Sequence, residues 1–403
     1  MTPDAAPTPD PTIEPTIEPT TEPTSEPTSE PTSEPTQAAT EHPPLEPYDA
    51  VLLLGFGGPE APEEVMPFLR RVTAGRGIPD ERLEAVGEHY HHFGGRSPIN
   101  DQNRALIAAL RAELDARGID TPIIWGNRNS APFIDDALRE SHAAGHRRVV
   151  ALTTSAYSCY SSCRQYRENL ADAAATVAEE GIELQIDKVA QYARRPGFAE
   201  ANAGELVRSL RALDGAPDSE IALLFVTHSI PDAMDDTSGP GDGEGNLYQR
   251  QHRALASQLT EEANRVLGRD LTGELVFCSR SGPPSQPWLE PDVNDRMREL
   301  AAAGVRTVVT APIGFVSDHM EVVYDLDTEA QETADELGLT HVRVPTVGTD
   351  AVFVRDLVDA LLERAAEARG EDVPQFEGRM PSVCAPGCCP NLRQARPALC
   401  GSD

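Results

Sequence analysis

The chain has 403 residues, a formal net charge of −32 and 39% hydrophobic residues. This length and apolar content allow a large buried core and predict two domains rather than one. The negative charge disfavours binding to nucleic acid and to anionic lipid, and no apolar run approaches the ~18 residues that a membrane-spanning helix needs. Because the first residues also lack a basic stretch followed by an apolar core, we expect a soluble cytoplasmic protein.

Residues 1–46 repeat a four-residue unit built on Glu-Pro-Thr. Proline in each unit opposes both helix and sheet, and the stretch offers almost no apolar surface to offset the entropy lost on ordering. We predict a disordered tail, which is either dispensable or a spacer.

From Tyr48 onward, apolar strands alternate with amphipathic helices. Helices are predicted at 63–71 and 352–369, and strands at 50–56, 122–126, 148–153, 183–187, 221–226, 274–277 and 307–311. This order is typical of the α/β class, in which parallel sheets are covered by helices and ligands bind at the carboxyl ends of strands. A polar break at 215–220 predicts two Rossmann-like domains facing a cleft, at 47–215 and 216–370, followed by a cysteine-rich extension at 371–403.

A histidine follows the strand at 221–226, in the run Thr227-His228-Ser229-Ile230-Pro231. An imidazole at the carboxyl end of a central strand can accept a proton near neutral pH or bind a metal ion. A structural or capping role is an equal alternative for an isolated histidine.

Four carboxylates follow the strand at 307–311 with helical spacing: Asp318, Glu321, Asp325 and Glu329. Steps of three, four and four place them on one face of a helix, with His319 beside the first. Such a row is usually a solvated face, but oxygen ligands in line could also pass Mg²⁺ or Fe²⁺ toward a reaction centre.

Together these two segments resemble the ferrochelatase family, whose signatures are a strand followed by His-Ser-Ile/Leu-Pro and a run containing Asp-His-x-Glu-x-x-Tyr-Asp/Glu. The similarity covers about residues 48–369 and includes Leu53-Leu-Gly-Phe-Gly-Gly-Pro, Phe93-Gly-Gly-Arg-Ser-Pro-Ile-Asn and Gly126-Asn-Arg-Asn. The resemblance implies a porphyrin iron chelatase of haem biosynthesis, with a porphyrin and Fe²⁺ as substrates and downstream haem-pathway enzymes as candidate partners.

The resemblance also implies which residues carry the reaction. His228 corresponds to the catalytic histidine and Glu321 to the carboxylate across the macrocycle, and both are expected to contact the iron. Asp318 and Asp325 are candidates for an iron path. Porphyrin contacts are expected from loops of the first domain: Phe56, Arg76, Ser97 and Tyr166. Arg76 or Arg128 could pair with a propionate.

Of the seven cysteines, Cys384, Cys388, Cys389 and Cys400 lie in the last twenty residues. Some ferrochelatases hold a 2Fe-2S cluster with one internal cysteine and three in a carboxyl-terminal extension, and the resemblance implies Cys163, Cys384, Cys388 and Cys389 as ligands here. Cys159 could replace Cys163, and Cys400 could replace one of the others. A zinc site of the same thiolates is the alternative, and either group would attach the extension to the first domain.

In its negative charge and its cysteine-rich extension, the chain resembles ferrochelatases that insert iron into coproporphyrin III to give coproheme. Protoporphyrin IX, with two propionates rather than four, is the alternative substrate. A cobalt or nickel chelatase and a non-catalytic haem or iron–sulfur sensor on the same scaffold are the other interpretations.

Overall fold

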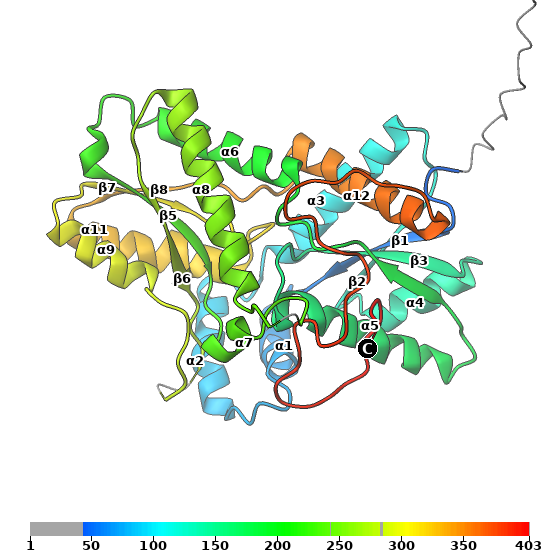
Figure 1. The fold of residues 1–403 in the computed structure, drawn as a ribbon. Coiled ribbons are helices and arrows are strands. Elements are labelled where there is room, and N and C mark those ends of the chain that lie inside the picture. Colours follow the sequence, from blue (N-terminus) through cyan, green and yellow to red (C-terminus); the bar gives the residue numbers. More distant parts are fainter. Residues whose placement is uncertain (1–42, 242, 283–284, 403) are drawn as a thin grey trace, which may run out of the picture. The chain divides into compact units, whose positions relative to one another are not determined.

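The computed structural model describes residues 43–241, 243–282 and 285–402, so most of the predicted disordered tail lies outside the described residues. The described residues contain two parallel four-stranded sheets (Figure 1), ordered β2-β1-β3-β4 and β6-β5-β7-β8. The predicted α/β fold is confirmed. The strands are β1 (Ala50–Gly55), β2 (Ile123–Asn127), β3 (Arg148–Thr153), β4 (Gln185–Lys188), β5 (Ile221–His228), β6 (Gly273–Cys278), β7 (Thr307–Ala311) and β8 (Thr340–Arg343).

The apolar runs become central strands because both faces of each sheet are covered. All six residues of β1 are buried, as are all five of β7. The sequence missed β8, whose four residues are exposed or half-buried and therefore show no apolar run. An edge strand of this kind is defined by its pairing with β7 rather than by its own composition.

Helices connect the strands, and none of the described ones is long and apolar enough to cross a membrane. The α-helices are α1 (Val65–Val72), α2 (Asp80–His92), α3 (Ile99–Ala116), α4 (Ile134–Ala143), α5 (Gln165–Ala178), α6 (Pro196–Arg211), α7 (Asp232–Asp236), α8 (Leu247–Leu267), α9 (Val293–Ala302), α10 (Met320–Tyr324), α11 (Ala330–Leu337) and α12 (Ala351–Arg369). Short 3₁₀ helices cover Pro62–Glu64 and Asp218–Glu220, and π-helical turns cover Tyr160–Arg164 and Asp325–Glu329.

The last helix joins the two halves. The Asp350 side chain caps α12 by accepting hydrogen bonds from the amides of Val352 and Phe353. The helix then packs against α3 and α6 of the first half, beside which it lies in Figure 1. One buried core consequently includes Leu53 of the first sheet and Phe225 of the second. The proposed boundary near residue 215 therefore separates two sheets that share a core.

Residues 43–46, expected to belong to the tail, are part of the fold. Leu45 is only 1% exposed and lies in the same core as Tyr48. The Arg369 guanidinium at the end of α12 donates to the carbonyl groups of Pro44 and Glu46. A single leucine provides the apolar surface that the repeats lack, so residues 43–46 belong to the folded core rather than to the predicted tail.

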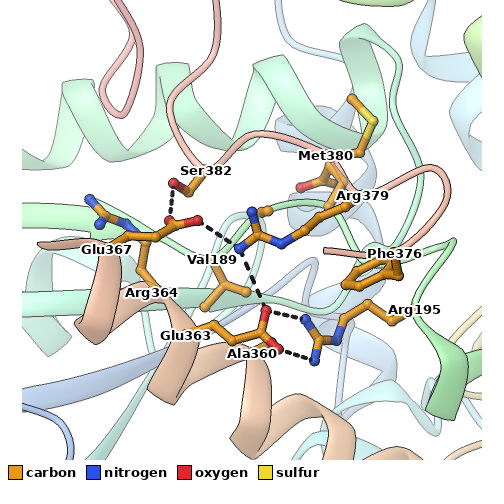
Figure 2. Close-up of a pocket in the computed structure, with 12 residues that line it drawn as sticks. Val189, Arg195, Ala360, Glu363, Arg364, Glu367, Phe376, Arg379, Met380 and Ser382 are labelled. Atoms are coloured by element: carbon orange, nitrogen blue, oxygen red, sulfur yellow. Dashed lines mark hydrogen bonds and ion pairs between the residues drawn. The ribbon is translucent and has the colours of Figure 1, made fainter. Parts of the chain in front are cut away.

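The extension after α12 is held first by a buried ion-pair network (Figure 2). Arg195 contacts Asp356 and Glu363, each at 2.8 Å, and Arg379 of the extension contacts Glu363 at 3.5 Å and Glu367 at 2.6 Å. Apart from Asp356, these side chains line a small pocket together with Phe376, Met380 and Ser382 of the extension. The extension is therefore fastened to α12 before it reaches the cysteines.

Replacing Arg195 with Ala is expected to destabilise the fold by about 3 kcal/mol, because it removes the ion-pair partner of the buried Asp356 and leaves Glu363 only its longer contact with Arg379. Urea unfolding followed by circular dichroism measures the loss. The matched control is Arg70→Ala, which breaks an exposed pair with Asp80 and should cost far less, because solvent screens that pair. Equal losses in the two variants would show that the network does not stabilise the fold.

Candidate active site

A cleft of about 400 Å³ lies at the carboxyl ends of six strands of the two sheets. The carboxyl ends of parallel strands are the usual ligand-binding edge of α/β sheets. Helices α1 and α2 add apolar side chains to its wall, including Phe68, Leu69 and Leu83. The strand-end residues that line the cleft are Phe56, Arg128, Thr154, His228, Ser281 and Gly314.

His228 ends β5, and its ring is oriented by the backbone. Its Nδ1 lies within hydrogen-bond distance of the Ser229 carbonyl oxygen. A carbonyl only accepts, so Nδ1 carries the hydrogen and, in the neutral imidazole, Nε2 carries the lone pair. Nε2 is the atom that faces Glu321, at 3.9 Å from its Oε1. The imidazole is therefore held as a base directed into the cleft.

Glu321 lies on the first turn of α10 between two histidines. Its Oε2 is 3.3 Å from Nδ1 of His319, and its side chain is 46% exposed. Burial lowers the pKa of His319, so this imidazole is largely neutral at pH 7. Glu321 is the most exposed of the three side chains, at 46% against 31% for His228 and 18% for His319.

The two other predicted carboxylates are in different environments. Asp325 lies in the cleft wall, accepts a hydrogen bond from the Ser279 hydroxyl, and has its pKa raised to about 7 by burial. Asp318 lies outside the cleft lining; it pairs with Arg343 at 3.1 Å and accepts a hydrogen bond from Thr346.

The predicted single face of four carboxylates was therefore wrong. Helix α10 begins at Met320, after Asp318, and the π-helical turn at Asp325–Glu329 changes the angular step between side chains. Only Glu321 and Asp325 of the four line the cleft. The helical spacing of a sequence does not reveal a widened turn, and Arg343 is remote from Asp318 in the chain.

All four residues predicted to contact the macrocycle line the same cleft as His228 and Glu321: Phe56, Arg76, Ser97 and Tyr166. Ser97 and Tyr166 are each 4% exposed, whereas Arg76 is exposed. The Arg128 guanidinium stacks over the Tyr166 ring at 4.3 Å and the Phe56 ring at 5.4 Å. Its Nε donates to Asn169 at 2.7 Å, which fixes the plane of the group.

Three features of the cleft were missed by sequence reasoning. The rings of His89 and Tyr324 stack with centroids 3.8 Å apart, joining α2 to α10 across the cleft wall. Tyr90 is buried nearby, and burial, followed by the charges of Glu321 and Asp325, raises its pKa. Arg393, from the extension, also lines the cleft. None of these has a local sequence signal, because each depends on contacts between distant segments.

The four cysteines favoured as ligands form a buried cluster of their own: Cys163, Cys384, Cys388 and Cys389. Cys159 lies instead in the main hydrophobic core, where its sulfur contacts the hydroxyls of Ser161 and Ser162. Cys400 is half-buried beside the Ile186 carbonyl, and Cys278 is buried at the end of β6.

The cysteine cluster connects both halves of the fold. Cys163 lies in the π-helical turn before α5, whereas Cys389 exchanges hydrogen bonds with Gly239, which follows α7. Figure 1 shows the extension reaching both α5 and α7. The extension was expected to be attached to the first domain; it contacts the second half as well.

Two cationic side chains, Lys188 and Arg167, lie near these thiols. Hydrogen bonds with Cys163 and Cys388, assisted by the charges of Lys188 and Arg167, lower the pKa of Cys384. Lys188 is 1% exposed, and its ammonium group donates to two neutral oxygens. Yet no three His, Cys, Asp or Glu side chains within the described ranges are arranged to hold a metal ion. The four thiols therefore lie together, but they are not positioned to coordinate one metal ion.

A model of the ferrochelatase family, described as "Ferrochelatase", matches residues 48–365. The chain belongs to the ferrochelatase family. It is 52% identical over 364 residues to "Coproporphyrin III ferrochelatase" of Streptomyces coelicolor, covering 89% of this chain and 97% of that one. It is also 52% identical over 373 residues to the protein of the same name from Leifsonia xyli, covering 88% of this chain and 94% of that one.

Among solved structures, the ferrochelatase chain matches "SirB from Bacillus subtilis with Fe3+" at 13% identity and a TM-score of 0.45, over 80% of this chain and 97% of that one. Family membership makes the chain a ferrochelatase, a lyase for which a porphyrin and Fe²⁺ fit as substrates. His228 and Glu321 both line the cleft.

Proposed function

We propose that this ferrochelatase inserts Fe²⁺ into coproporphyrin III and releases coproheme. The observation that carries the proposal is the pairing of His228 and Glu321 in one cleft, in a chain about half identical to proteins named for that substrate. The net reaction joins Fe²⁺ to the metal-free porphyrin and releases two protons from its pyrrole nitrogens. A suitable site needs a proton acceptor and a mobile metal-binding group.

His228 supplies the acceptor. With Nδ1 donating to Ser229, the Nε2 lone pair is free to take a pyrrole proton, and the strand end holds the ring rigidly. Glu321 supplies the mobile oxygen ligand. Asp325, with its pKa near 7, can exchange a proton with solvent or with the neighbouring carboxylate at the working pH.

The macrocycle must separate His228 from Glu321 when it binds. Their 3.9 Å spacing is smaller than the ~7 Å that a planar ring occupies between two contacting atoms, which is twice a van der Waals contact. Glu321 is the half-exposed partner, so it is the side chain that rotates. Substrate binding thereby moves Glu321 to the opposite face of the ring from the base.

The decisive experiment is anaerobic incubation of the purified chain with Fe²⁺ and either coproporphyrin III or protoporphyrin IX, followed by the visible spectrum. Faster metallation of coproporphyrin is the expected result. Faster metallation of protoporphyrin would correct the substrate, and preference for Co²⁺ or Ni²⁺ over Fe²⁺ would correct the metal. No metallation of either porphyrin would favour a haem or iron–sulfur sensor.

We further propose that Cys163, Cys384, Cys388 and Cys389 hold a 2Fe-2S cluster. Their thiolates are the donor set that such a cluster requires, and the buried cations Lys188 and Arg167 would compensate its negative charge. When bound, the group would supply redox chemistry; the cysteines themselves fasten the extension to α5 and to the segment after α7.

Replacing Cys384 with Ser is expected to abolish the visible iron–sulfur absorption and to lower the thermal midpoint by about 5 °C or more, because the extension loses its fastening. Cys400→Ser is the matched control and should retain the absorption. A colourless wild-type protein that contains zinc would establish the zinc alternative. A Cys384→Ser protein with unchanged absorption would remove this residue from the ligand set.

A further inference from the structure

A residue of the cysteine-rich extension forms part of the cleft that contains the catalytic pair. Arg393 lines it together with Arg76, after α1, and Arg128, after β2. The three guanidinium groups thus come from three segments far apart in the chain. Arg393 is close enough to affect its neighbours. Arg76 is exposed as a whole, but partial loss of water around its guanidinium, followed by the like charges of Arg393 and Arg128, lowers its pKa.

These three cations lack the partners that are common elsewhere in this acidic chain. Within residues 43–402 as described, neither Arg76, Arg128 nor Arg393 forms an ion pair with a carboxylate, although the chain has 66 acidic and 34 basic residues. Arg128 instead donates to the neutral Asn169 and stacks on aromatic rings. Like charges held together without anions favour an external anion as the ligand.

The extension holds Arg393 in place from both sides. On the preceding side, the Asn391 amide donates to the Tyr160 hydroxyl at 2.9 Å, and its Oδ1 accepts hydrogen bonds from the backbone amides of Arg393 and Gln394. On the following side, Arg396 pairs with Asp172 and Glu168 of α5. Tyr160 itself lines the cleft. The loop at 391–396 is therefore built against the cleft wall, with the cysteine cluster as its upstream anchor.

We infer that Arg393 binds a peripheral carboxylate of the porphyrin, so that the carboxyl-terminal extension completes the substrate site. The inference rests on the proposed function for the identity of the ligand. Guanidinium groups bind carboxylates through paired, charge-assisted hydrogen bonds, and a porphyrin with four propionates offers more such contacts than one with two. The extension thus has a role in substrate binding besides any cluster that its cysteines hold.

The test compares Arg393→Gln with Arg211→Gln, a control that removes the same charge from an exposed position on α6 outside the cleft. Binding of metal-free coproporphyrin III is measured by porphyrin fluorescence. Arg393→Gln should raise Kd about 5- to 10-fold, the loss of one partly hydrated charge-assisted contact. Arg211→Gln should leave Kd unchanged, and Arg393→Lys should fall between. At saturating porphyrin, kcat should stay within twofold of wild type.

The tetramethyl ester of coproporphyrin III, which has the same macrocycle without negative charge, distinguishes contact from folding. Arg393→Gln should bind this ester as wild type does. An equal loss of affinity for ester and acid would mean a disturbed loop and would overturn the inference, as would an unchanged Kd for the acid. If the wild-type protein binds coproporphyrin III but does not insert iron into it, the proposed function is refuted. The Kd values of wild type and Arg393→Gln could still be compared in that case.

Discussion

Replacing His228 with Ala should lower kcat for iron insertion by about 10³-fold, within the range typical of removing a positioned general base. The imidazole Nε2 faces the cleft, and no other described side chain combines a strand-end position with an oriented lone pair toward Glu321. The porphyrin Kd should change less than threefold, because the macrocycle contacts the rest of the lining. Stopped assays of coproheme formation and fluorescence titration measure the two quantities separately.

His91→Ala is the matched control for that substitution. His91 lies on α2, is exposed and does not line the cleft, so its removal should leave both kcat and Kd unchanged. Near-normal turnover in His228→Ala would assign proton removal to another group. Loss of porphyrin binding in that variant would mean that His228 positions the macrocycle rather than accepting its proton.

Replacing Asp325 with Asn should stabilise the protein at pH 8 by about 4 kcal/mol and have little effect at pH 4. Burial raises the pKa of Asp325 from 3.8 to about 7. Between these values the folded state keeps a proton that the unfolded state has lost, so stability falls as pH rises through that window. Each pKa unit corresponds to about 1.4 kcal/mol, and the full cost is present above pH 7.

Urea unfolding at pH 4 and pH 8 tests the expected pH dependence. Asn keeps an oxygen that can accept the Ser279 hydrogen bond, so the substitution removes the charge with little change in shape. The exposed Asp335→Asn serves as control and should show no gain that grows with pH. Equal stability of wild type and Asp325→Asn at pH 8 would place the carboxylate in a well-hydrated environment.

Such a gain would identify Asp325 as a residue kept at a cost to stability. A buried carboxyl that titrates near neutral pH beside Glu321 is useful where two protons must leave the substrate. The Asn variant should therefore be more stable and slower, and measuring kcat alongside unfolding would show whether both changes occur together.

The α/β fold, seven of the eight described strands and the family were all predictable from the amino-acid sequence. Apolar strands and amphipathic helices can be predicted from the local periodicity of apolar residues along the chain. His228 and Glu321 lie in short contiguous motifs, so their roles could be carried over position by position. The resemblance also implied which four thiols would gather, and they form one buried cluster.

Features that depend on contacts between distant segments became visible only in the folded chain. Pairing with β7 defines β8, a π-helical turn breaks the carboxylate row, and Arg343 holds Asp318 outside the cleft. Arg393 reaches the active site because Asn391 and Arg396 dock its loop on α5 and the turn before it. Residues far apart in the chain become contact partners only when it folds, so the local periodicity and spacing of the sequence do not predict them.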